Sequence, residues 1–354
     1  MENILITGGT GFIGSHTCLK LLELGYKITV IDSLVNSTDA SLKKVSDILK
    51  IKINGLSANI SFEKGDIRNN FFLNDVFNKA LILKTPITSV IHFAGLKSVK
   101  ESNLKPLEYW DVNVSGSINL LKIMDKYSCR NIVFSSSATI YGSNKEKNSF
   151  KEDSKINPIN IYGETKANVE KILSYLHFSN PEKWNIACLR YFNPIGAHPS
   201  GLIGESPLKE PENLFPYICQ VASGKRKILK IFGNDWPTKD GTCIRDFIHV
   251  MDLVDAHICA LENLHKGKHK LINLNIGTGK GTSVLELIRT FEEVNSIKIP
   301  FIIHGRRNGD SAYVVADNSL SHEILNWKPK RSLVEMCRDG WNWQKKNPLG
   351  YRKN

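Results

Sequence analysis

The first half of the chain alternates short apolar runs with longer stretches in which apolar residues recur every three or four positions. Short apolar runs predict buried strands, and the three-to-four spacing predicts amphipathic helices. We expect strands at residues 4–7, 27–31, 59–65, 89–93 and 131–135, and helices at 12–24, 40–49, 70–83, 107–127 and 161–176. This alternation predicts an α/β fold, a doubly wound parallel sheet with helices on both faces.

The pattern loosens from about residue 194. Prolines, glycines and short segments continue to Gly241, which indicates the start of a smaller mixed α/β lobe. We expect a first domain at residues 1–190 and a second lobe mainly at 191–354, with a segment near 240–262 returning to the first domain. Residues 36–58 form a longer connection around the helix expected at 40–49, and the pattern assigns this connection no role.

Composition places the chain among ordinary globular proteins. Of 354 residues, 41% are hydrophobic and 23% charged, and no apolar run approaches the roughly 20 residues of a membrane span. The chain enters a strand at residue 4 without a basic and apolar leader, so we expect a cytoplasmic protein. Seven scattered cysteines and ten histidines without metal-ligand spacing predict neither a disulfide framework nor a metal site.

The formal net charge of +12 raises the question of a nucleic-acid partner. The lysines, however, are spread along the whole chain, with only short clusters such as residues 224–227. A dispersed lysine bias is typical of a solvated surface, and it also attracts an anionic small substrate. We therefore expect no nucleic acid.

Gly8, Gly11 and Gly14 stand three residues apart between the first expected strand and the first expected helix. Such a turn lets backbone N–H groups approach a pyrophosphate, and the helix N-terminus adds partial positive charge. This spacing in a strand–turn–helix context predicts a Rossmann-type dinucleotide site. Asp32 ends the second expected strand, where a carboxylate binds an adenosine ribose and repels a 2′-phosphate, which favours NAD over NADP.

Loops after the other expected strands extend this site, because open α/β sheets bind ligands at the carboxyl ends of their strands. After the third strand, Asp66 and Ile67 are placed to meet the adenine. A run after the fourth strand is placed along the path toward the nicotinamide: Phe93, Ala94, Gly95, Leu96 and Lys97.

The candidate chemistry lies in Tyr162 and Lys166, downstream of the serine run that ends at Ser137. In a helix at 161–176 the two side chains lie on one face, a turn apart. A lysine ammonium beside a phenol favours the phenolate, so we expect the pKa of the tyrosine to fall from about 10 toward neutrality. A tyrosine tuned in this way exchanges a proton with a sugar hydroxyl.

Together, the glycine turn and the Tyr-x-x-x-Lys pair behind a serine resemble the extended short-chain dehydrogenase/reductase superfamily. Within it, the chain resembles the UDP-glucose 4-epimerase family over nearly its whole length. The resembling segments are Thr7–Thr17, His92–Lys97, Lys105–Tyr109, Phe134–Gly142, Leu189–Gly201, Ile231–Asn234, Arg245–Asp252 and Trp341–Gln344.

The resemblance implies roles for individual residues. Tyr162 is the catalytic acid and base, Lys166 orients the nicotinamide ribose and lowers the pKa of the tyrosine, and Ser137 hydrogen-bonds the sugar's 4-hydroxyl. Besides these three, the implied cofactor contacts are Gly8, Gly11, Phe12, Ile13, Gly14, Asp32, Asn36, Ser37, Asp66, Ile67, Phe93, Ala94, Gly95, Lys97, Asn113 and Phe192. Besides Ser137 and Tyr162, the implied UDP-sugar contacts are Lys97, Asn193, Asn213, Leu214, Lys230, Ile231, Phe232, Arg245, Arg307, Asp310 and Val314.

The implied reaction inverts C4 of a UDP-hexose and interconverts UDP-glucose and UDP-galactose. Tyr162 removes the proton of the C4 hydroxyl while hydride passes to NAD; the 4-keto sugar then turns, and hydride returns to its other face. NAD is regenerated in each turnover, so we expect it to stay tightly bound. The family commonly forms homodimers through two long helices, here those expected at 107–127 and 161–176.

Two other functions stay open on the sequence. A nucleotide-sugar 4,6-dehydratase also begins by oxidising C4, but it needs a further acid–base pair, usually Asp-Glu after the serine, where this chain has Ala138 and Thr139. A non-catalytic NAD-binding regulator is disfavoured because Tyr162, Lys166 and Ser137 are all retained. The sequence does not decide between galactose use and glycan supply as the pathway served.

The chain departs from many family members beside the sugar's C2 substituent. In the family, the residue four places after the aspartate of Arg-Arg-x-Gly-Asp lies near that substituent, and a tyrosine there narrows the pocket. Counting from Asp310 reaches Val314, whereas Tyr313 lies one place earlier. We expect Val314 to leave room for an N-acetyl group, so that UDP-GlcNAc and UDP-GalNAc interconvert as well.

Overall fold

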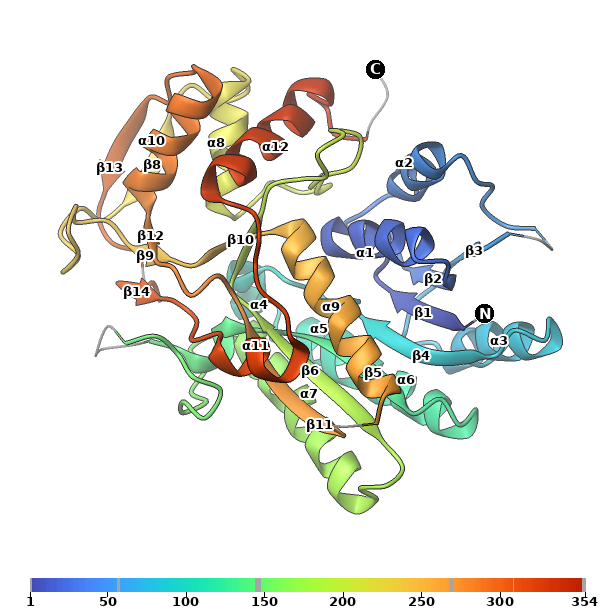
Figure 1. The fold of residues 1–354 in the computed structure, drawn as a ribbon. Coiled ribbons are helices and arrows are strands. Elements are labelled where there is room, and N and C mark those ends of the chain that lie inside the picture. Colours follow the sequence, from blue (N-terminus) through green and yellow to red (C-terminus); the bar gives the residue numbers. More distant parts are fainter. Residues whose placement is uncertain (1, 56–57, 144–147, 268–269, 308, 352–354) are drawn as a thin grey trace.

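Seven parallel strands form the main sheet, in the order β11-β6-β5-β4-β1-β2-β3 (Figure 1). The computed structural model describes residues 2–55, 58–143, 148–267, 270–307 and 309–351. The strand bounds are β1 Asn3–Thr7, β2 Lys27–Asp32, β3 Ile60–Lys64, β4 Ile87–His92, β5 Asn131–Ser137, β6 Asn185–Tyr191 and β11 Leu271–Ile276. The strand order reverses between β1 and β4, so the crevice at their carboxyl ends is where such sheets bind ligands.

Helices cover both faces of this sheet. One face carries α1 and α9, which pack against each other, and the other carries α3, α6 and α7. Their bounds are α1 Phe12–Glu23, α3 Asn70–Ile82, α6 Gly116–Lys126, α7 Ile161–Ser179 and α9 Val250–His265. Alternate strand residues supply two separate cores: Ile4 and Ile6 enter one, and Leu5 enters the other. The predicted doubly wound parallel sheet is therefore confirmed.

The predicted helix at 107–127 is wrong in one part. After α4 (Val99–Leu104) and α5 (Pro106–Tyr109), the chain forms a π-helical segment, η1 (Trp110–Ser115), before α6 begins at Gly116. A π-helical turn adds a residue to each hydrogen-bonded ring, and such turns are frequent at functional sites. This one carries the buried Asn113.

A smaller lobe stands beyond the carboxyl ends of the strands (Figure 1). Its elements are α8 (Leu214–Ala222), α10 (Val284–Asn295), α12 (Leu333–Lys346) and the parallel pair β8 (Leu229–Phe232) and β13 (Phe301–His304). A core of its own, which includes Phe215, Phe291 and Met336, joins these elements. Both α10 and α12 begin with a capping box, which satisfies their first backbone N–H groups.

Short strands and returning segments link the lobe to the sheet. β7 (Asn193–Ile195) pairs with β10 (Phe247–His249), and β9 (Ile244–Arg245) lies between β12 (Thr282–Ser283) and β14 (Tyr313–Val314). After β10 the chain runs through α9 and then β11, which is an edge strand of the main sheet. The remaining elements are α2 (Ala40–Leu49), which packs on α1, the 3-10 turn η2 (Ala138–Tyr141) and α11 (Ser319–Leu325).

Two properties of the whole fold bear on its environment. No helix within the described ranges is long and apolar enough to cross a membrane. All seven cysteines are unpaired, and all except Cys259 are buried.

Candidate active site

Tyr162 and Lys166 lie one turn apart at the start of α7, beside the end of β5 where Ser137 stands. The Asn160 side chain caps α7 and accepts a hydrogen bond from the Gly163 backbone N–H at 2.8 Å. The Ser137 side chain lies close enough to the Tyr162 hydroxyl to lower the pKa of the phenol. Lys166 Nζ lies 5.9 Å from the centroid of the Tyr162 ring. The structure therefore brings the three expected catalytic residues together.

The expected fall in the pKa of Tyr162 is wrong for the protein alone. Burial raises this pKa to about 12, and the Ser137 side chain opposes the rise only in part. Lys166 donates to the backbone oxygen of Ser135 at 2.6 Å, and burial lowers its own pKa to about 8. Loss of the tyrosine proton near neutral pH therefore needs a further positive charge beside the phenol.

The glycine turn after β1 forms a cradle that larger residues would fill. Gly8 has φ +69, and a Cβ added there would lie 2.7 Å from the Ala94 backbone nitrogen. A Cβ added at Gly14 would lie 2.4 Å from the Gly8 oxygen. α1 begins after Gly11 and has no acidic residue in its first turn, which contains Phe12 and Ile13. Free N–H groups at the positive end of a helix fit a pyrophosphate.

The Asp32 carboxylate is anchored beside this cradle at the end of β2. It accepts hydrogen bonds from the backbone nitrogens of Thr10 (3.1 Å) and Leu34 (2.9 Å) and from the Ser37 hydroxyl (3.1 Å). A carboxylate fixed in this place fits an unphosphorylated ribose, as NAD has. Asn36, in the same loop, accepts a hydrogen bond from the Lys209 backbone at 3.4 Å.

The two adenine candidates after β3 have different surroundings. The Asp66 carboxylate pairs with Arg68 at 2.7 Å, and hydrogen bonds from Arg68 hold its pKa below its usual range. The Ile67 side chain is buried and packs closely on Gly116 of α6. Of these two residues, only Asp66 has a partly exposed side chain that can contact a ligand.

Asn113 joins the loop after β4 to α7. Its side chain accepts a hydrogen bond from the Leu96 backbone N–H at 2.7 Å and donates to the Leu96 oxygen and the Thr165 hydroxyl, both at 3.0 Å. A Cβ at Gly95 would lie 3.1 Å from the Asn113 side-chain oxygen and 3.9 Å from Lys166 Nζ. The loop is thereby held next to the candidate catalytic lysine.

Arg245, Arg307 and Asp310 meet where the small lobe faces the sheet. Asp310 Oδ1 lies 3.0 Å from Arg307 Nη2 and 3.6 Å from Arg245 Nη2. The Arg307 guanidinium carbon lies 5.6 Å from the centroid of the Phe232 ring. Two guanidinium groups beside an aromatic face fit the diphosphate and base of a nucleotide.

Val314 and Tyr313 face opposite sides of β14, because successive strand residues alternate. Val314 packs against a cluster that includes Phe192 and Ala138, the residue after Ser137. A Tyr313 ring carbon lies 3.5 Å from the place of a Cβ at Gly281, on the β12 side. Val314, rather than Tyr313, therefore lies on the side of Ser137, the candidate catalytic serine.

The other predicted residues are more dispersed. Lys97 forms an ion pair with Glu205 at 3.0 Å. The Ile231 side chain is buried in the core of the small lobe, whereas Lys230 and Phe232 on the same strand are exposed. Asn193 is the first residue of β7. Asn213 is exposed and stands just before α8, and Leu214 is the first residue of that helix. Phe93 and Ala94 pack against the two cores of the main sheet.

Sequence reasoning missed two groups of residues. The first is a buried ion pair between Glu170 of α7 and Arg190 of β6. Its signal was present, because Glu170 follows Lys166 by four residues on the same helix face. The second is a set of polar contacts between the lobes, at Lys209 and Glu212, which no local pattern identifies.

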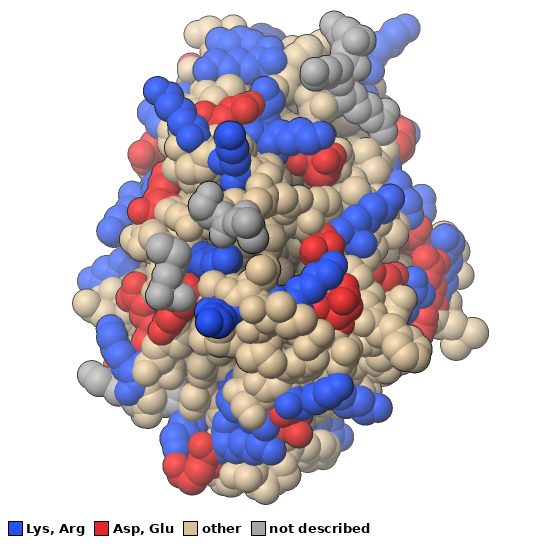
Figure 2. Space-filling view, turned by 90° about the vertical axis from the view of Figure 1, so that its right-hand side faces the viewer, with Lys and Arg blue, Asp and Glu red and all other residues tan. Residues whose placement is uncertain are grey.

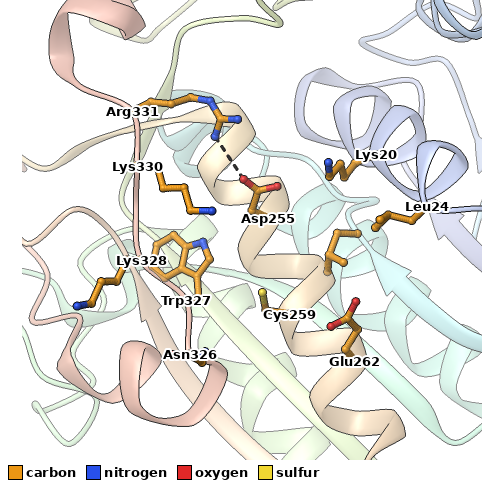
Figure 3. A pocket seen from close by; sticks show the side chains of 11 residues that line it. Lys20, Leu24, Asp255, Cys259, Glu262, Asn326, Trp327, Lys328, Lys330 and Arg331 are labelled. Carbon is orange, nitrogen blue, oxygen red and sulfur yellow. Dashed lines mark hydrogen bonds and ion pairs between the residues drawn. The ribbon is translucent and has the colours of Figure 1, made fainter.

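One hollow lies apart from the predicted site residues, and the charge on one face of the molecule is mixed. A hollow of about 430 Å³ between α1, α9 and residues 326–331 is lined by Lys20, Asp255, Trp327 and others, but by none of the predicted site residues (Figure 3). Figure 2 shows basic and acidic side chains interspersed over one face of the molecule. On that face the positive excess is dispersed rather than gathered into a track for nucleic acid.

Comparison with known proteins gives one consistent family. Residues 4–277 match the model of the NAD dependent epimerase/dehydratase family. The whole chain is 49% identical to UDP-glucose 4-epimerase 2 of Arabidopsis thaliana and covers 98% of it. It is 46% identical over 353 residues to the bifunctional UDP-glucose 4-epimerase and UDP-xylose 4-epimerase 3 of that plant, covering 99% of the chain and 98% of the relative. The structure of a UDP-glucose-4-epimerase from Stenotrophomonas maltophila, with bound NAD and formylated UDP-arabinopyranose, is similar with a TM-score of 0.91 and 43% identity, covering 98% of this chain and 99% of that one.

Proposed function

This chain belongs to the NAD dependent epimerase/dehydratase family, and we propose that it is an NAD-dependent UDP-glucose 4-epimerase of the extended short-chain dehydrogenase/reductase superfamily. The observation that carries the proposal is the meeting of Tyr162, Ser137 and Lys166 at the end of β5. The glycine cradle lies at the carboxyl end of β1, which β4 separates from β5 in the sheet, and the small lobe supplies a pair of arginines. Similarity to UDP-glucose 4-epimerases over the full length supports the same activity.

Tyr162 carries the proton. Its phenolate takes the proton of the sugar's C4 hydroxyl, and the phenol so formed returns a proton to the same oxygen after the sugar has turned. Ser137, whose side chain lies beside the Tyr162 hydroxyl, accepts or donates a hydrogen bond at the sugar oxygen as the charge on that oxygen changes. Lys166 is held toward Ser135 and placed to orient a ribose beside the tyrosine. Bound NAD supplies the hydride acceptor and donor, and its positively charged ring favours the Tyr162 phenolate.

The small lobe holds the part of the substrate that does not react. Arg245 and Arg307 are suited to bidentate hydrogen bonds with diphosphate oxygens, and Asp310 orients both guanidinium groups from between them. A firm grip on the diphosphate leaves the sugar free to rotate about its glycosidic link. That freedom is what inversion at C4 requires, because hydride must reach both faces of the ring.

This site lacks the additional acid and base that a dehydratase uses to remove water. Ala138 is buried and apolar, and Thr139 donates its hydroxyl to Ser137 at 3.0 Å. Neither side chain can act as the further acid and base that removal of water needs. The arrangement after Ser137 therefore favours epimerisation over the dehydratase reaction.

The substrate range proposed for this chain is broader than UDP-glucose and UDP-galactose. Val314 faces the cluster beside Ser137 and is shorter than a tyrosine by most of an aromatic ring. The room it leaves is suited to an N-acetyl group at C2, which supports interconversion of UDP-GlcNAc and UDP-GalNAc.

A homodimer and a cytoplasmic location complete the proposal. Leu104 and Leu107, in the α4–α5 region that packs against α7, have 74% and 83% of their surface exposed. Large apolar side chains exposed next to each other are typical of an interface. Seven unpaired cysteines fit a reducing compartment.

The proposed activity is tested by incubating the purified protein with NAD and either UDP-glucose or UDP-galactose, and following both sugars by chromatography. We expect the same equilibrium mixture from either side. Tyr162→Phe, which keeps the ring and removes the hydroxyl, should lower kcat by roughly 10²–10⁴-fold. Absence of interconversion in the NAD-loaded protein would overturn the proposal.

A further inference from the structure

α7 carries a third residue on the face of Tyr162 and Lys166, namely Glu170, one turn further along. Each of the three contacts one residue of the serine run at the end of β5. The pairs are Tyr162 with the Ser137 side chain, Lys166 with the Ser135 oxygen and Glu170 with the Ser136 hydroxyl. The helix and the strand that carry the proton chemistry are thus joined at three successive points.

The Glu170 carboxylate is also locked from its other side. It and Arg190 of β6 form a buried ion pair, with 4% and 3% of their side chains exposed. Arg190 Nη2 donates to Glu170 Oε2 at 2.8 Å, and Nε donates to Oε1 at 3.1 Å. The remaining guanidinium nitrogen donates to the Tyr141 hydroxyl at 2.9 Å and to the Glu152 backbone oxygen at 2.8 Å. A fork of this kind fixes the carboxylate in one orientation.

Among the residues that the structure describes, Glu170 is the carboxylate that acts on Lys166. Burial lowers the pKa of His92 on β4 to about 3, so its ring is neutral. Burial raises the pKa of Tyr162 on α7 to about 12 and that of Tyr191 on β6 well above its usual value, so both phenols are neutral in the protein without NAD. Arg190 on β6 is a cation. The negative charge of Glu170 therefore opposes the effect of burial on Lys166.

We propose that Glu170 is a positioning residue of the epimerase: locked between Arg190 and Ser136, its carboxylate fixes α7 against the end of β5 and keeps Lys166 charged. The proposal rests on the function proposed above. Without the carboxylate, Lys166 would lose its proton at lower pH, and Ser136 would no longer tie the serine run to the helix.

The test compares Glu170→Gln, which keeps the shape and removes the charge, with the wild-type holoenzyme across pH. We expect the alkaline limb of the pH profile of kcat to move to lower pH by about one unit. A nearby opposite charge shifts the pKa of a titrating group by about this amount, and the variant removes that charge. Glu170→Asp, which keeps the charge, should return the limb toward its wild-type position. Glu164→Gln removes another carboxylate of α7 that lies off this stripe, and it should leave the limb unchanged.

A second readout does not depend on turnover. The Lys166 ammonium is titrated by ¹⁵N NMR, with its signal assigned from Lys166→Met, and should lose its proton at lower pH in Glu170→Gln. This result is separate from the proposed activity, whose failure would show as a wild-type protein that does not epimerise. An unchanged Lys166 titration together with an equal loss of kcat at every pH would make Glu170 merely structural and overturn the proposal.

Glu170→Gln leaves Arg190 buried without a counter-ion, which can prevent folding. In that event the double variant Glu170→Gln/Arg190→Gln removes both charges. Because Glu170 lies one turn from Lys166 and Arg190 lies beyond it, we expect a smaller shift of the titration in the same direction. A double variant in which Lys166 titrates as in the wild type would overturn the proposal.

Discussion

The pKa values of the candidate catalytic side chains depend on burial as much as on their spacing in the helix. Tyr162 and Lys166 stand four residues apart, and that spacing could be read from the sequence. Their pKa values could not, because the burial that raises the one and lowers the other comes from strands distant in the chain. The sequence therefore predicted which residues meet at this site, and it mispredicted the protonation state of the tyrosine in the protein without NAD.

Lys166→Met should stabilise the protein after its dinucleotide has been removed. The folded pKa of about 8 lies below the unfolded value of about 10.4, so stability rises with pH between these values. Below pH 8 the buried cation costs on the order of 1–3 kcal/mol, which methionine does not pay. Thermal unfolding should show a higher Tm for the variant at pH 7 and a difference that shrinks toward pH 10. The same pH dependence in both proteins would contradict the assignment.

Val314 tests the proposed substrate range at a single side chain. Val314→Tyr should lower kcat/KM for UDP-GlcNAc at least tenfold relative to UDP-glucose, since a ring placed in this space would clash with the acetyl group. Tyr313→Phe is the matched control, because Tyr313 faces the other side of β14, and it should leave the ratio of the two constants unchanged. Equal ratios in the wild type and Val314→Tyr would refute the role of this position.

At the scale of elements, the sequence predicted the helices and strands that have a repeating pattern of apolar residues and missed the elements that lack one. The strands from β1 to β5 and their helices follow apolar patterns, and the structure has them within a few residues. The π-helical segment η1 keeps the apolar spacing of an α-helix, so its wider turn is invisible to that pattern. Strands of two residues, such as β9 and β14, are too short to show any period, although they bring Arg245 and Val314 together.

The glycine turn links an element boundary to cofactor binding. In Gly14→Ala the new methyl group would meet the Gly8 oxygen at 2.4 Å, and because that neighbour is backbone, α1 must move away from β1. We expect a loss of about 1–3 kcal/mol in the free energy of unfolding and a protein that no longer retains NAD. Chemical denaturation and the ratio of absorbance at 260 and 280 nm measure the two effects. Gly305→Ala, where a Cβ meets nothing within 4 Å, should retain NAD as the wild type does.

At the scale of the molecule, polar contacts bridge the small lobe and the cofactor side of the sheet. Lys97 pairs with Glu205 at 3.0 Å, and Lys209 pairs with Glu101 at 2.6 Å. Ser98 adds a hydrogen bond to Glu212 at 2.7 Å. The partners in each contact lie about a hundred residues apart in the chain and show no pattern, so sequence reasoning could not pair them.

The bridge between the lobes should slow the release of NAD. Exposed ion pairs are worth about 1 kcal/mol or less, so Lys209→Glu should speed release only about two- to fivefold, and raising the salt concentration should have a similar effect. Dilution into an excess of a labelled dinucleotide measures the release rate. The reversed pair Lys209→Glu/Glu101→Lys should restore it. Lys298→Glu is the control, because Lys298 pairs with Glu292 within the small lobe, and a rate equal to that of Lys209→Glu would refute the bridge.

The fate of the hydrogen on C4 tests the central claim most directly. UDP-glucose labelled with deuterium at C4 is converted to UDP-galactose in ordinary water, and the product is examined by NMR and mass spectrometry. Because hydride leaves C4 for bound NAD and returns to the opposite face, the deuterium should remain on C4 with inverted configuration. Loss of the deuterium to the solvent would show that the hydrogen leaves as a proton, and it would contradict the account.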